Sequence, residues 1–345
     1  MPRKKRILIT GVAHYLGGEL ARRLEGRRDV DAIFGIDVEE PTVALGRTEF
    51  VHADTRHSVI AKLVRELKLD TVVHAAVIVN TGGSARSLHE SNVIGTMNVI
   101  AACSGESSPV RQFVAKSSVA IYGVQPDDPS FLREEMAADR RPQSPVGRDL
   151  QELEQMVQDF AVRNRRVAVT VMRLGYVIGI KRPTALTRYF SLRIVPTTLG
   201  FDPRLQFLHE EDSVEALYQA IVKEKPGVFN VAGDGVVLLS QALAIAGRRS
   251  APLQPPYLNP LSRVVGRLAG VSLPPHLMDF LNYGQVVDCE KLHRELDWRP
   301  RYSTKACLVD MTSRRLEPVT AAVTPTFREE RELQRYLDRR ARVKA

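Results

Sequence analysis

The fold of this chain is decided by the stretch RILITGVAHYLGGELARRL, residues 6–24. Its first part, residues 6–10, predicts a β-strand, and residues 19–24 predict an amphipathic helix. Between them, Gly11 allows a tight turn and Gly17 allows the helix to pack closely on the strand. The start of the helix points unpaired N–H groups and a positive dipole at the turn. This order of strand, turn and helix predicts a cradle for the pyrophosphate of a dinucleotide.

An acidic residue, Asp37, stands twenty residues after Gly17, at the end of the next predicted strand. A carboxylate at this place accepts hydrogen bonds from the ribose hydroxyls of NAD and repels the 2′-phosphate of NADP. The spacing therefore predicts NAD as the cofactor. An Asp that only begins a surface loop is the alternative at this position.

The first half of the chain alternates short apolar runs with longer amphipathic stretches. Six parallel strands joined mostly by helices explain this pattern, which predicts an α/β fold with a Rossmann-type doubly wound parallel sheet. A helix is expected to begin near Arg148. The strands are expected at residues 6–10, 33–37, 49–52, 71–75, 112–117 and 168–174.

The texture of the sequence changes after Arg173, where prolines and glycines become frequent. We expect an NAD-binding Rossmann domain over residues 1–175, completed by a return strand near 226–233. A smaller C-terminal substrate lobe, built from inserted segments, is expected over residues 176–325. Residues 326–345 are expected to form a charged helical tail.

The composition of the chain indicates an ordinary globular protein. Of its 345 residues, 44% are hydrophobic and 26% are charged. The three cysteines lie far apart, which argues against a disulfide framework or a thiolate metal site and favours a reducing compartment. No apolar run is long enough to span a membrane or to act as a signal peptide before the first strand. We therefore expect a soluble cytoplasmic protein with no metal and no membrane partner.

The basic residues give the chain a net charge of +9. They occur as scattered pairs without interleaved aromatic residues, which is typical of a solvated surface. A small-molecule partner is therefore expected rather than a nucleic acid. A basic interaction protein that uses the fold as a platform is the weakest alternative.

Several further segments resemble the extended short-chain dehydrogenase/reductases, and among them the NAD-dependent epimerase/dehydratase family, nearest to its UDP-glucose 4-epimerase branch. Each segment is short, but together they span residues 6–300 in the order of the family, which makes a chance match improbable. The segments are residues 10–17, 53–54, 73–76, 92–96, 117–123, 173–179, 207–212 and 295–300.

The resemblance implies roles for residues around the cofactor. It implies that Asp54 contacts adenine, that Ala75 and Ala76 line the path of the pyrophosphate and ribose, and that Asn92 steadies a neighbouring helix. The residues that spacing and resemblance together assign to the cofactor are Gly11, His14, Tyr15, Leu16, Gly17, Asp37, Asp54, Thr55, His74, Ala75, Ala76, Asn92 and Ser117.

His14 departs from the family, which normally has Gly at the middle position of the turn. A side chain there crowds the approach of the backbone to the pyrophosphate, although a protonated imidazole can itself contact a phosphate. Direct contact and a displaced loop are both consistent with the sequence.

The catalytic pair of the family is missing at its usual place. In the family, a Tyr whose pKa is lowered by a Lys one helical turn later takes a proton from a sugar hydroxyl as hydride leaves for NAD. The pattern Ser-Pro-Tyr-x-x-x-Lys falls on residues 144–150, where Val146 and Leu150 occupy the Tyr and Lys positions. Neither side chain can take a proton or hold the nicotinamide ribose hydroxyls.

Other residues must therefore supply the chemistry. Ser118 matches the family's supporting hydroxyl, unless it only satisfies a backbone group at the strand end. Asp149 can share the helix face of Val146 and is the candidate surrogate base, although an acid at a helix start also complements the helix dipole. Tyr122 and Tyr176 are poor bases without a lysine, because an ordinary tyrosine has a pKa near about 10.

The resemblance places Arg204, His209 and Ser118 at the substrate. Related epimerases use arginines to neutralise the diphosphate of a nucleotide sugar. Here one such position falls on Leu205, and residues 268–290 contain no Arg or Lys. A nucleotide-sugar substrate, like a homodimer, therefore rests on the resemblance alone.

Two functions remain open at this point. One is an atypical NAD-dependent oxidoreductase or isomerase that acts on a sugar or nucleotide sugar and retains Ser118. The other is a non-catalytic NAD-binding sensor or scaffold, in which Val146 and Leu150 pack against the cofactor. We favour the first, because Ser118 and the small lobe resemble a substrate pocket.

Overall fold

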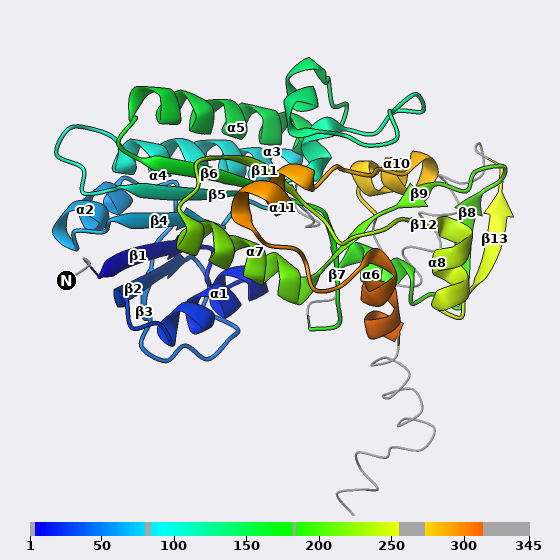
Figure 1. Ribbon diagram of the computed structural model, residues 1–345, viewed down its shortest axis with the longest axis horizontal. Helices are drawn as coiled ribbons and strands as arrows, with labels where there is room; N and C mark the ends of the chain where they lie inside the picture. The colour runs from blue at the N-terminus through cyan, green and yellow to red at the C-terminus, as the bar shows by residue number, and fades with distance from the viewer. Residues whose placement is uncertain (1–3, 80–83, 182–183, 255–272, 313–345) are drawn as a thin grey trace, which may run out of the picture.

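The computed structural model describes residues 4–79, 84–181, 184–254 and 273–312, and its centre is a seven-stranded parallel sheet (Figure 1). The strand order is β11-β6-β5-β4-β1-β2-β3, so the order reverses between β1 and β4. This arrangement confirms the predicted Rossmann-type doubly wound sheet. The strands are β1 (Lys5–Thr10), β2 (Val30–Asp37), β3 (Glu49–His52), β4 (Thr71–His74), β5 (Gln112–Ser118), β6 (Ala168–Leu174) and β11 (Gly227–Val231).

The predicted strands are confirmed, with ends that differ by no more than three residues. The central strand β4 is buried along its whole length, and β1 is buried over its last four residues. Such continuous burial is expected of a parallel sheet covered on both faces. The return strand predicted near 226–233 is β11, which pairs in parallel with β6 and completes the sheet.

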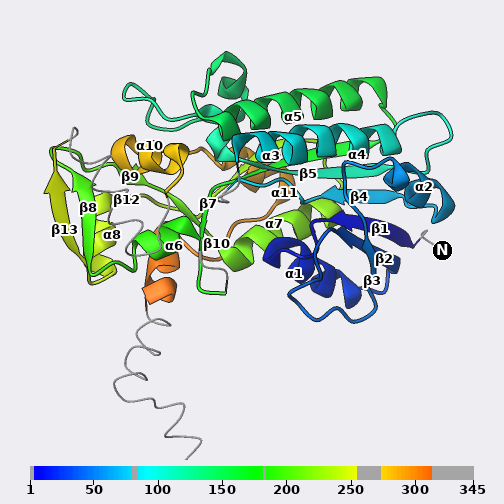
Figure 2. The same ribbon diagram turned by 180° about the vertical axis from the view of Figure 1, so that it is seen from behind.

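Helices cover both faces of the sheet, which makes a three-layer molecule (Figure 2). On one face, α2, α4 and α5 share an apolar cluster with alternate residues of the strands, such as Leu8 and Val72. On the other face, α1, α7 and α11 share a second cluster with the intervening residues, such as Ile7 and Val73. These helices are α1 (Tyr15–Glu25), α2 (Val59–Glu66), α4 (Gly95–Cys103), α5 (Pro145–Arg163), α7 (Glu210–Lys223) and α11 (Glu290–Leu296).

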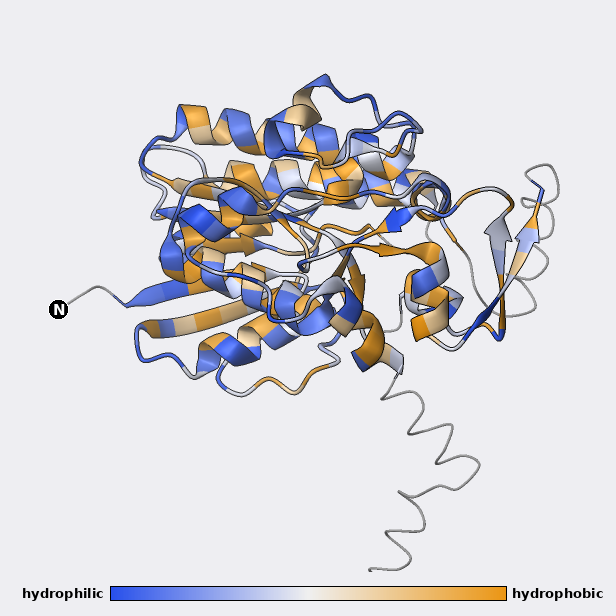
Figure 3. Cartoon of the chain, turned by 45° about the vertical axis from the view of Figure 1, so that its right-hand side comes forward, coloured by the Kyte–Doolittle hydropathy of each residue, from blue (hydrophilic) through white to orange (hydrophobic). Residues whose placement is uncertain are grey.

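Figure 3 shows hydrophobic residues concentrated on the sheet strands, while the surrounding helices carry both hydrophobic and hydrophilic residues. This is the pattern of amphipathic helices that each turn one side to a shared core. Helix α5 begins at Pro145 rather than near Arg148, because the Ser144 hydroxyl accepts a hydrogen bond from the Gly147 amide at 3.1 Å and caps the helix. Proline at the first helical position fits this start.

Most of the remaining elements lie beyond the carboxyl ends of the central strands, on the right of Figure 1, whereas α3 lies beside α5 above the middle of the sheet. Three small two-stranded sheets, β7 with β10, β9 with β12 and β8 with β13, hold this part together. The elements are α3 (Ala85–His89), β7 (Tyr176–Ile178), α6 (Ala185–Tyr189), β8 (Ile194–Thr198), β9 (Arg204–Leu205), β10 (Phe207–His209), β12 (Val237–Leu238), α8 (Leu239–Ile245), β13 (Arg249–Leu253), α10 (Pro275–Tyr283), a π-helical turn (Glu90–Ile94) and two 3₁₀ turns (Val119–Tyr122 and Glu134–Asp139).

Most of these elements come from residues that follow β6, as expected of a lobe built from inserted segments, although α3 and the three short turns come from earlier in the chain. The exact domain boundaries stay a prediction. The charged tail predicted over 326–345 falls outside the described residues. Within the described ranges, none of the helices combines the length and apolar character that a membrane crossing needs.

Candidate cofactor and active site

The turn after β1 depends on two glycines that touch each other. Gly11 has a φ of +82°, a conformation that L side chains rarely adopt. A Cβ built on Gly17 would lie 2.3 Å from the carbonyl oxygen of Gly11, so any larger residue there would force the strand and α1 apart. The structure therefore gives both glycines the roles in the turn that the sequence predicts.

Asp37 ends β2 and points its carboxylate at the glycine turn. One carboxylate oxygen accepts a hydrogen bond from the Ala13 amide at 2.9 Å, and the other accepts one from the Val38 amide at 2.8 Å. The acidic group predicted to meet a ribose thus lies beside the turn predicted to hold phosphates.

A cavity opens at the carboxyl edge of the sheet, where the strand order reverses. Ligands of doubly wound folds bind at this place, because the loops diverge there and leave a crevice. The described residues that line the cavity are His14, Tyr15, Leu16, Ala75, Val77, Ile78, Val79, Lys116, Ser117, Ser118, Leu174, Gly175, Tyr176, Val177, Thr184, Glu210 and Ser213. Residues that follow β1, β4 and β6 meet there with the end of β5.

The start of α1 forms one wall of the cavity. His14 is the N-cap residue, with φ −84° and ψ 150°, a backbone conformation that needs no glycine. The turn therefore accommodates a side chain at this position. Burial raises the pKa of the Tyr15 phenol, and the nearby carboxylate of Glu210 adds to the shift. Tyr15 is consequently protonated at neutral pH.

His74 lies beneath the cavity rather than in its lining. Its two ring nitrogens lie 2.9 Å from the Thr10 hydroxyl and 3.0 Å from the Thr96 hydroxyl. Burial, together with the positive charge of Lys116, lowers the pKa of His74 to about 4. The imidazole is therefore neutral, and it ties β4 to β1 and α4.

Asn92 and Ala76 fix the loop that follows β4. The Asn92 side chain accepts a hydrogen bond from the Ile78 amide at 2.7 Å and donates one to the Ile78 carbonyl at 2.9 Å. The Ala76 amide donates to the Thr10 hydroxyl at 3.2 Å. These contacts hold the loop whose next residues line the cavity.

Asp54 and Thr55, which were assigned to the cofactor from the sequence, follow β3 and lie outside the lining of this cavity. Asp54 forms a bidentate ion pair with Arg56, and the guanidinium lowers the pKa of the carboxyl. The Thr55 hydroxyl lies close enough to Gly95 that a Cβ there would come within 2.8 Å of it. Their predicted contact with the cofactor stays a prediction.

Ser117 and Ser118 end β5, and their hydroxyls form hydrogen bonds with different neighbours. The Ser118 hydroxyl accepts a hydrogen bond from the Ala120 amide at 3.2 Å, so it caps the following turn as well as lining the cavity. The Ser117 hydroxyl donates to the Glu154 carboxylate at 2.5 Å. Glu154 in turn forms a buried ion pair with Arg173.

A buried polar network extends from this ion pair. Arg173 donates to the Tyr122 hydroxyl at 2.8 Å, and that hydroxyl donates to the Asn230 side chain at 2.7 Å. Burial raises the pKa of Tyr122 despite the nearby guanidinium. Tyr122 is therefore a structural hydroxyl outside the cavity lining and a poor base.

Helix α5 places Val146 and Leu150 in an apolar cluster and outside the cavity lining. Asp149 also lies outside the lining. One of its oxygens is 2.8 Å from the His89 ring, and this hydrogen bond raises the pKa of His89. The other Asp149 oxygen is buried and has no hydrogen-bond partner among the described residues. The structure thus does not bring Asp149 to Ser118.

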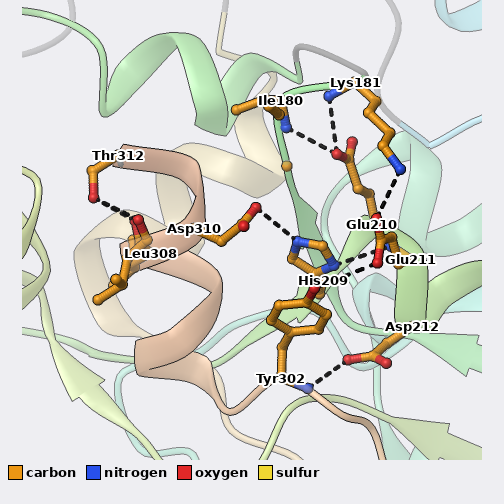
Figure 4. Close-up of polar contacts among 12 residues, drawn as sticks. Ile180, Lys181, His209, Glu210, Glu211, Asp212, Tyr302, Leu308, Asp310 and Thr312 are labelled. Atoms are coloured by element: carbon orange, nitrogen blue, oxygen red, sulfur yellow. Dashed lines mark hydrogen bonds and ion pairs between the residues drawn. The ribbon is translucent and has the colours of Figure 1, made fainter. Parts of the chain in front are cut away.

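The two predicted substrate residues also lie outside the cavity lining. His209 caps α7 through its Nδ1, and its Nε2 lies 3.2 Å from the carboxylate of Asp310 (Figure 4). Its ring stacks on Tyr302, with ring centres 3.7 Å apart. Arg204 has an exposed side chain, while its backbone carbonyl accepts a hydrogen bond from the Gln285 amide. The structure does not bring either residue to Ser118.

Two charged residues of the cavity were missed from the sequence, Lys116 and Glu210. Glu210 receives hydrogen bonds from the amides of Ile180 and Lys181 at 3.0 and 2.9 Å, as Figure 4 shows. A signal for Lys116 existed, because a lysine inside a buried strand two residues before Ser118 faces the same side of the sheet.

Known proteins resemble this chain along most of its length. A model of the NAD dependent epimerase/dehydratase family matches residues 7–232. An uncharacterised protein of Mycobacterium tuberculosis is 36% identical over 323 residues, which cover 91% of this chain and 85% of that protein.

Two solved structures share the fold. The UDP-glucose 4-epimerase of Thermotoga maritima, solved with UDP-glucose, gives a TM-score of 0.68 at 16% identity and covers 91% of this chain and 99% of its own. The UDP-glucuronic acid 4-epimerase of Bacillus cereus, solved with NAD, gives a TM-score of 0.65 at 19% identity. The match covers 88% of this chain and 96% of that one. Because the family model spans more than half of the sequence, the chain belongs to the NAD-dependent epimerase/dehydratase family.

Proposed function

We propose that this chain binds NAD at the carboxyl edge of its sheet and uses it to transfer hydride to and from a sugar carbon of a nucleotide sugar. Family membership supports NAD as the cofactor. Related structures with UDP-glucose or NAD support this class of ligand. The chemistry that bound NAD supplies is reversible acceptance of hydride from a carbon that carries a hydroxyl.

One observation carries this proposal: a single cavity joins the phosphate turn to the Ser118 hydroxyl. Residues 14–16 stand at one wall and residues 116–118 at another. A dinucleotide whose pyrophosphate lies at the start of α1 therefore reaches Ser118 with its other half. A site for phosphate binding alone would not need a hydroxyl at the far wall.

The residues in and around the cavity have separate roles. The turn at Gly11 and Gly17 offers N–H groups to the pyrophosphate, and Asp37 accepts hydrogen bonds from the adenosine ribose. Ser118 binds the sugar hydroxyl oxygen, and the proton that this oxygen loses as hydride leaves for NAD passes to solvent water. Asp149 has no place in this proposal, because its carboxylate is engaged with His89.

We expect the proposed reaction to be slower than the reaction of a family member that has the Tyr and Lys pair. A positioned general base contributes on the order of 10² to 10⁴ in rate, and Val146 and Leu150 cannot supply one. A non-catalytic sensor is the alternative, and family membership does not favour it.

A single-turnover assay tests the proposal. Concentrated protein is mixed with NAD and with UDP-glucose, UDP-galactose or UDP-glucuronic acid, and NADH formation is followed by its absorbance. We expect slow NADH formation with at least one of these sugars, and at least tenfold slower formation by Ser118→Ala. Ser104→Ala, at the exposed end of α4, is the matched control and keeps the wild-type rate. No NADH formation with any of the three sugars contradicts the proposal.

We also propose that two copies pair, as the resemblance implies, and that α4 and α5 form the contact. Met97 on α4 and Val162 on α5 are exposed apolar side chains. Sedimentation velocity tests this: a dimer is expected for the wild type and a monomer for Met97→Glu with Val162→Glu. A monomeric wild type contradicts it.

A further inference from the structure

A lysine shares the cavity with Ser118. Lys116 and Ser118 are two residues apart on β5, so their side chains project from the same face of the sheet. Both line the cavity. The Lys116 amine donates a hydrogen bond to the carbonyl oxygen of Val77 at 2.5 Å, in the loop that follows β4. The ammonium group is therefore held at the point where β4 and β5 end side by side.

Lys116 determines the positive charge of this wall. Among the described residues of the lining, it is the one Lys or Arg. His74, on the neighbouring strand, is fully buried, and burial together with the Lys116 charge lowers the His74 pKa to about 4. A neutral imidazole leaves the ammonium of Lys116 as the positive group there.

The position of β5 in the sheet decides which part of a dinucleotide Lys116 meets. The phosphate turn follows β1, and β4 lies between β1 and β5. Neighbouring strands are about 4.8 Å apart, so the end of β5 is roughly 10 Å from the turn across the sheet. A group at that distance from the pyrophosphate belongs to the ribose and nicotinamide half of the cofactor.

We propose that Lys116 does from a strand what Leu150 cannot do from α5: its ammonium binds the hydroxyls of the nicotinamide ribose. An ammonium carries three N–H donors, so it can serve the Val77 carbonyl and ribose oxygens together. Ser118, on the same face, then lies next to the ring that exchanges hydride. This inference rests on the proposed function, because it requires NAD in the cavity.

Binding of cofactor fragments tests the inference without relying on activity. NAD, ADP-ribose and ADP are titrated by calorimetry into wild-type protein, Lys116→Met and Lys116→Gln. ADP-ribose keeps the second ribose and ADP lacks it. We expect both variants to bind NAD and ADP-ribose roughly tenfold to a hundredfold more weakly, because a hydrogen bond to a charged group is lost, and to bind ADP as the wild type does.

The control is Lys62→Met, which removes an exposed lysine from α2 and should change none of the three affinities. If the variants bound ADP more weakly by the same factor as NAD, the inference would be overturned, since Lys116 would then lie at the phosphates. Unchanged affinity for NAD in both variants would overturn it as well, while leaving the proposed function intact. A wild-type protein that binds neither NAD nor ADP would instead contradict the proposed function.

Discussion

Glu154 of α5 and Arg173 of β6 form an ion pair beneath the cavity, with nitrogen and oxygen 2.7 Å apart and side chains only 2% and 3% exposed. The same carboxylate accepts a hydrogen bond from Ser117, the neighbour of Ser118. The pair thus connects the packing of α5 on the sheet to the end of β5. Glu154 is the residue whose negative charge balances the buried guanidinium of Arg173.

Replacing Glu154 by Gln should destabilise the protein strongly, because it leaves the buried guanidinium of Arg173 without a counter-charge. Breaking a buried pair from one side typically costs about 3 to 5 kcal/mol. Urea unfolding measures the loss. Glu152→Gln, on the exposed side of the same helix, is the control and should stay within about 0.5 kcal/mol of the wild type. A loss of similar size in both variants would contradict a special role for the pair.

Asp37 should select NAD over NADP. Asp37→Asn keeps an acceptor for the Ala13 amide but removes the charge that repels a 2′-phosphate. We expect this variant to bind NAD more weakly, by about 1 to 3 kcal/mol, and to lose most of its discrimination against NADP. Competition calorimetry gives both affinities. Asp31→Asn, on the exposed start of the same strand, is the control, and an unchanged preference in Asp37→Asn would rule the assignment out.

His74 should make the protein sensitive to acid. Burial and the Lys116 charge lower its pKa from 6.5 to about 4 in the folded state, so protons bind more tightly to the unfolded chain. The contribution of His74 to stability is therefore complete above pH 6.5 and is lost as the pH falls toward 4. The loss is on the order of 3 kcal/mol by about pH 4. Urea unfolding across this range should show a shallower pH dependence in His74→Asn than in His52→Asn, the exposed control. Equal slopes would contradict the prediction.

Restoring the family pair should accelerate hydride transfer. Val146→Tyr with Leu150→Lys supplies the proton acceptor and its cationic partner, and the gain expected from a general base is on the order of 10² to 10⁴ in rate. The variant should also be less stable, because Leu150 is fully buried in an apolar cluster and a Lys there is desolvated. Val146→Phe with Leu150→Met is the control and should gain nothing. Fast turnover by the wild type that survives Ser118→Ala would show that the chemistry lies elsewhere.

Much of the fold could be predicted because parallel strands leave a strong local signal. Strands β3 and β6 begin and end at the predicted residues. Helix α5 begins three residues before the predicted Arg148, because its start is marked by a hydrogen bond from Gly147 to Ser144 and not by a change in hydrophobicity. The glycine turn and Asp37 were found because their roles follow from spacing along the chain.

The rest of the site could not be predicted, because it depends on contacts between distant segments. Helical spacing allows Asp149 to share a face with Val146, but only the fold shows that His89 binds its carboxylate. His209 stacks on Tyr302, which comes from ninety-three residues later in the chain. Lys116 stands in an apolar strand, and only the register of β5 beside β4 shows that its amine reaches the carbonyl of Val77.

The central claim is that the cavity at the carboxyl edge of the sheet binds NAD, and a calorimetric titration of NAD into the nucleotide-free protein tests it most directly. The account predicts saturable binding of one NAD per chain, competition by ADP-ribose, and severe weakening in Gly17→Val, whose side chain would collide with the carbonyl of Gly11. Thermal unfolding of that variant without ligand checks that it still folds. Absence of saturable binding to the wild type, or equal affinity in a folded Gly17→Val, would contradict the account.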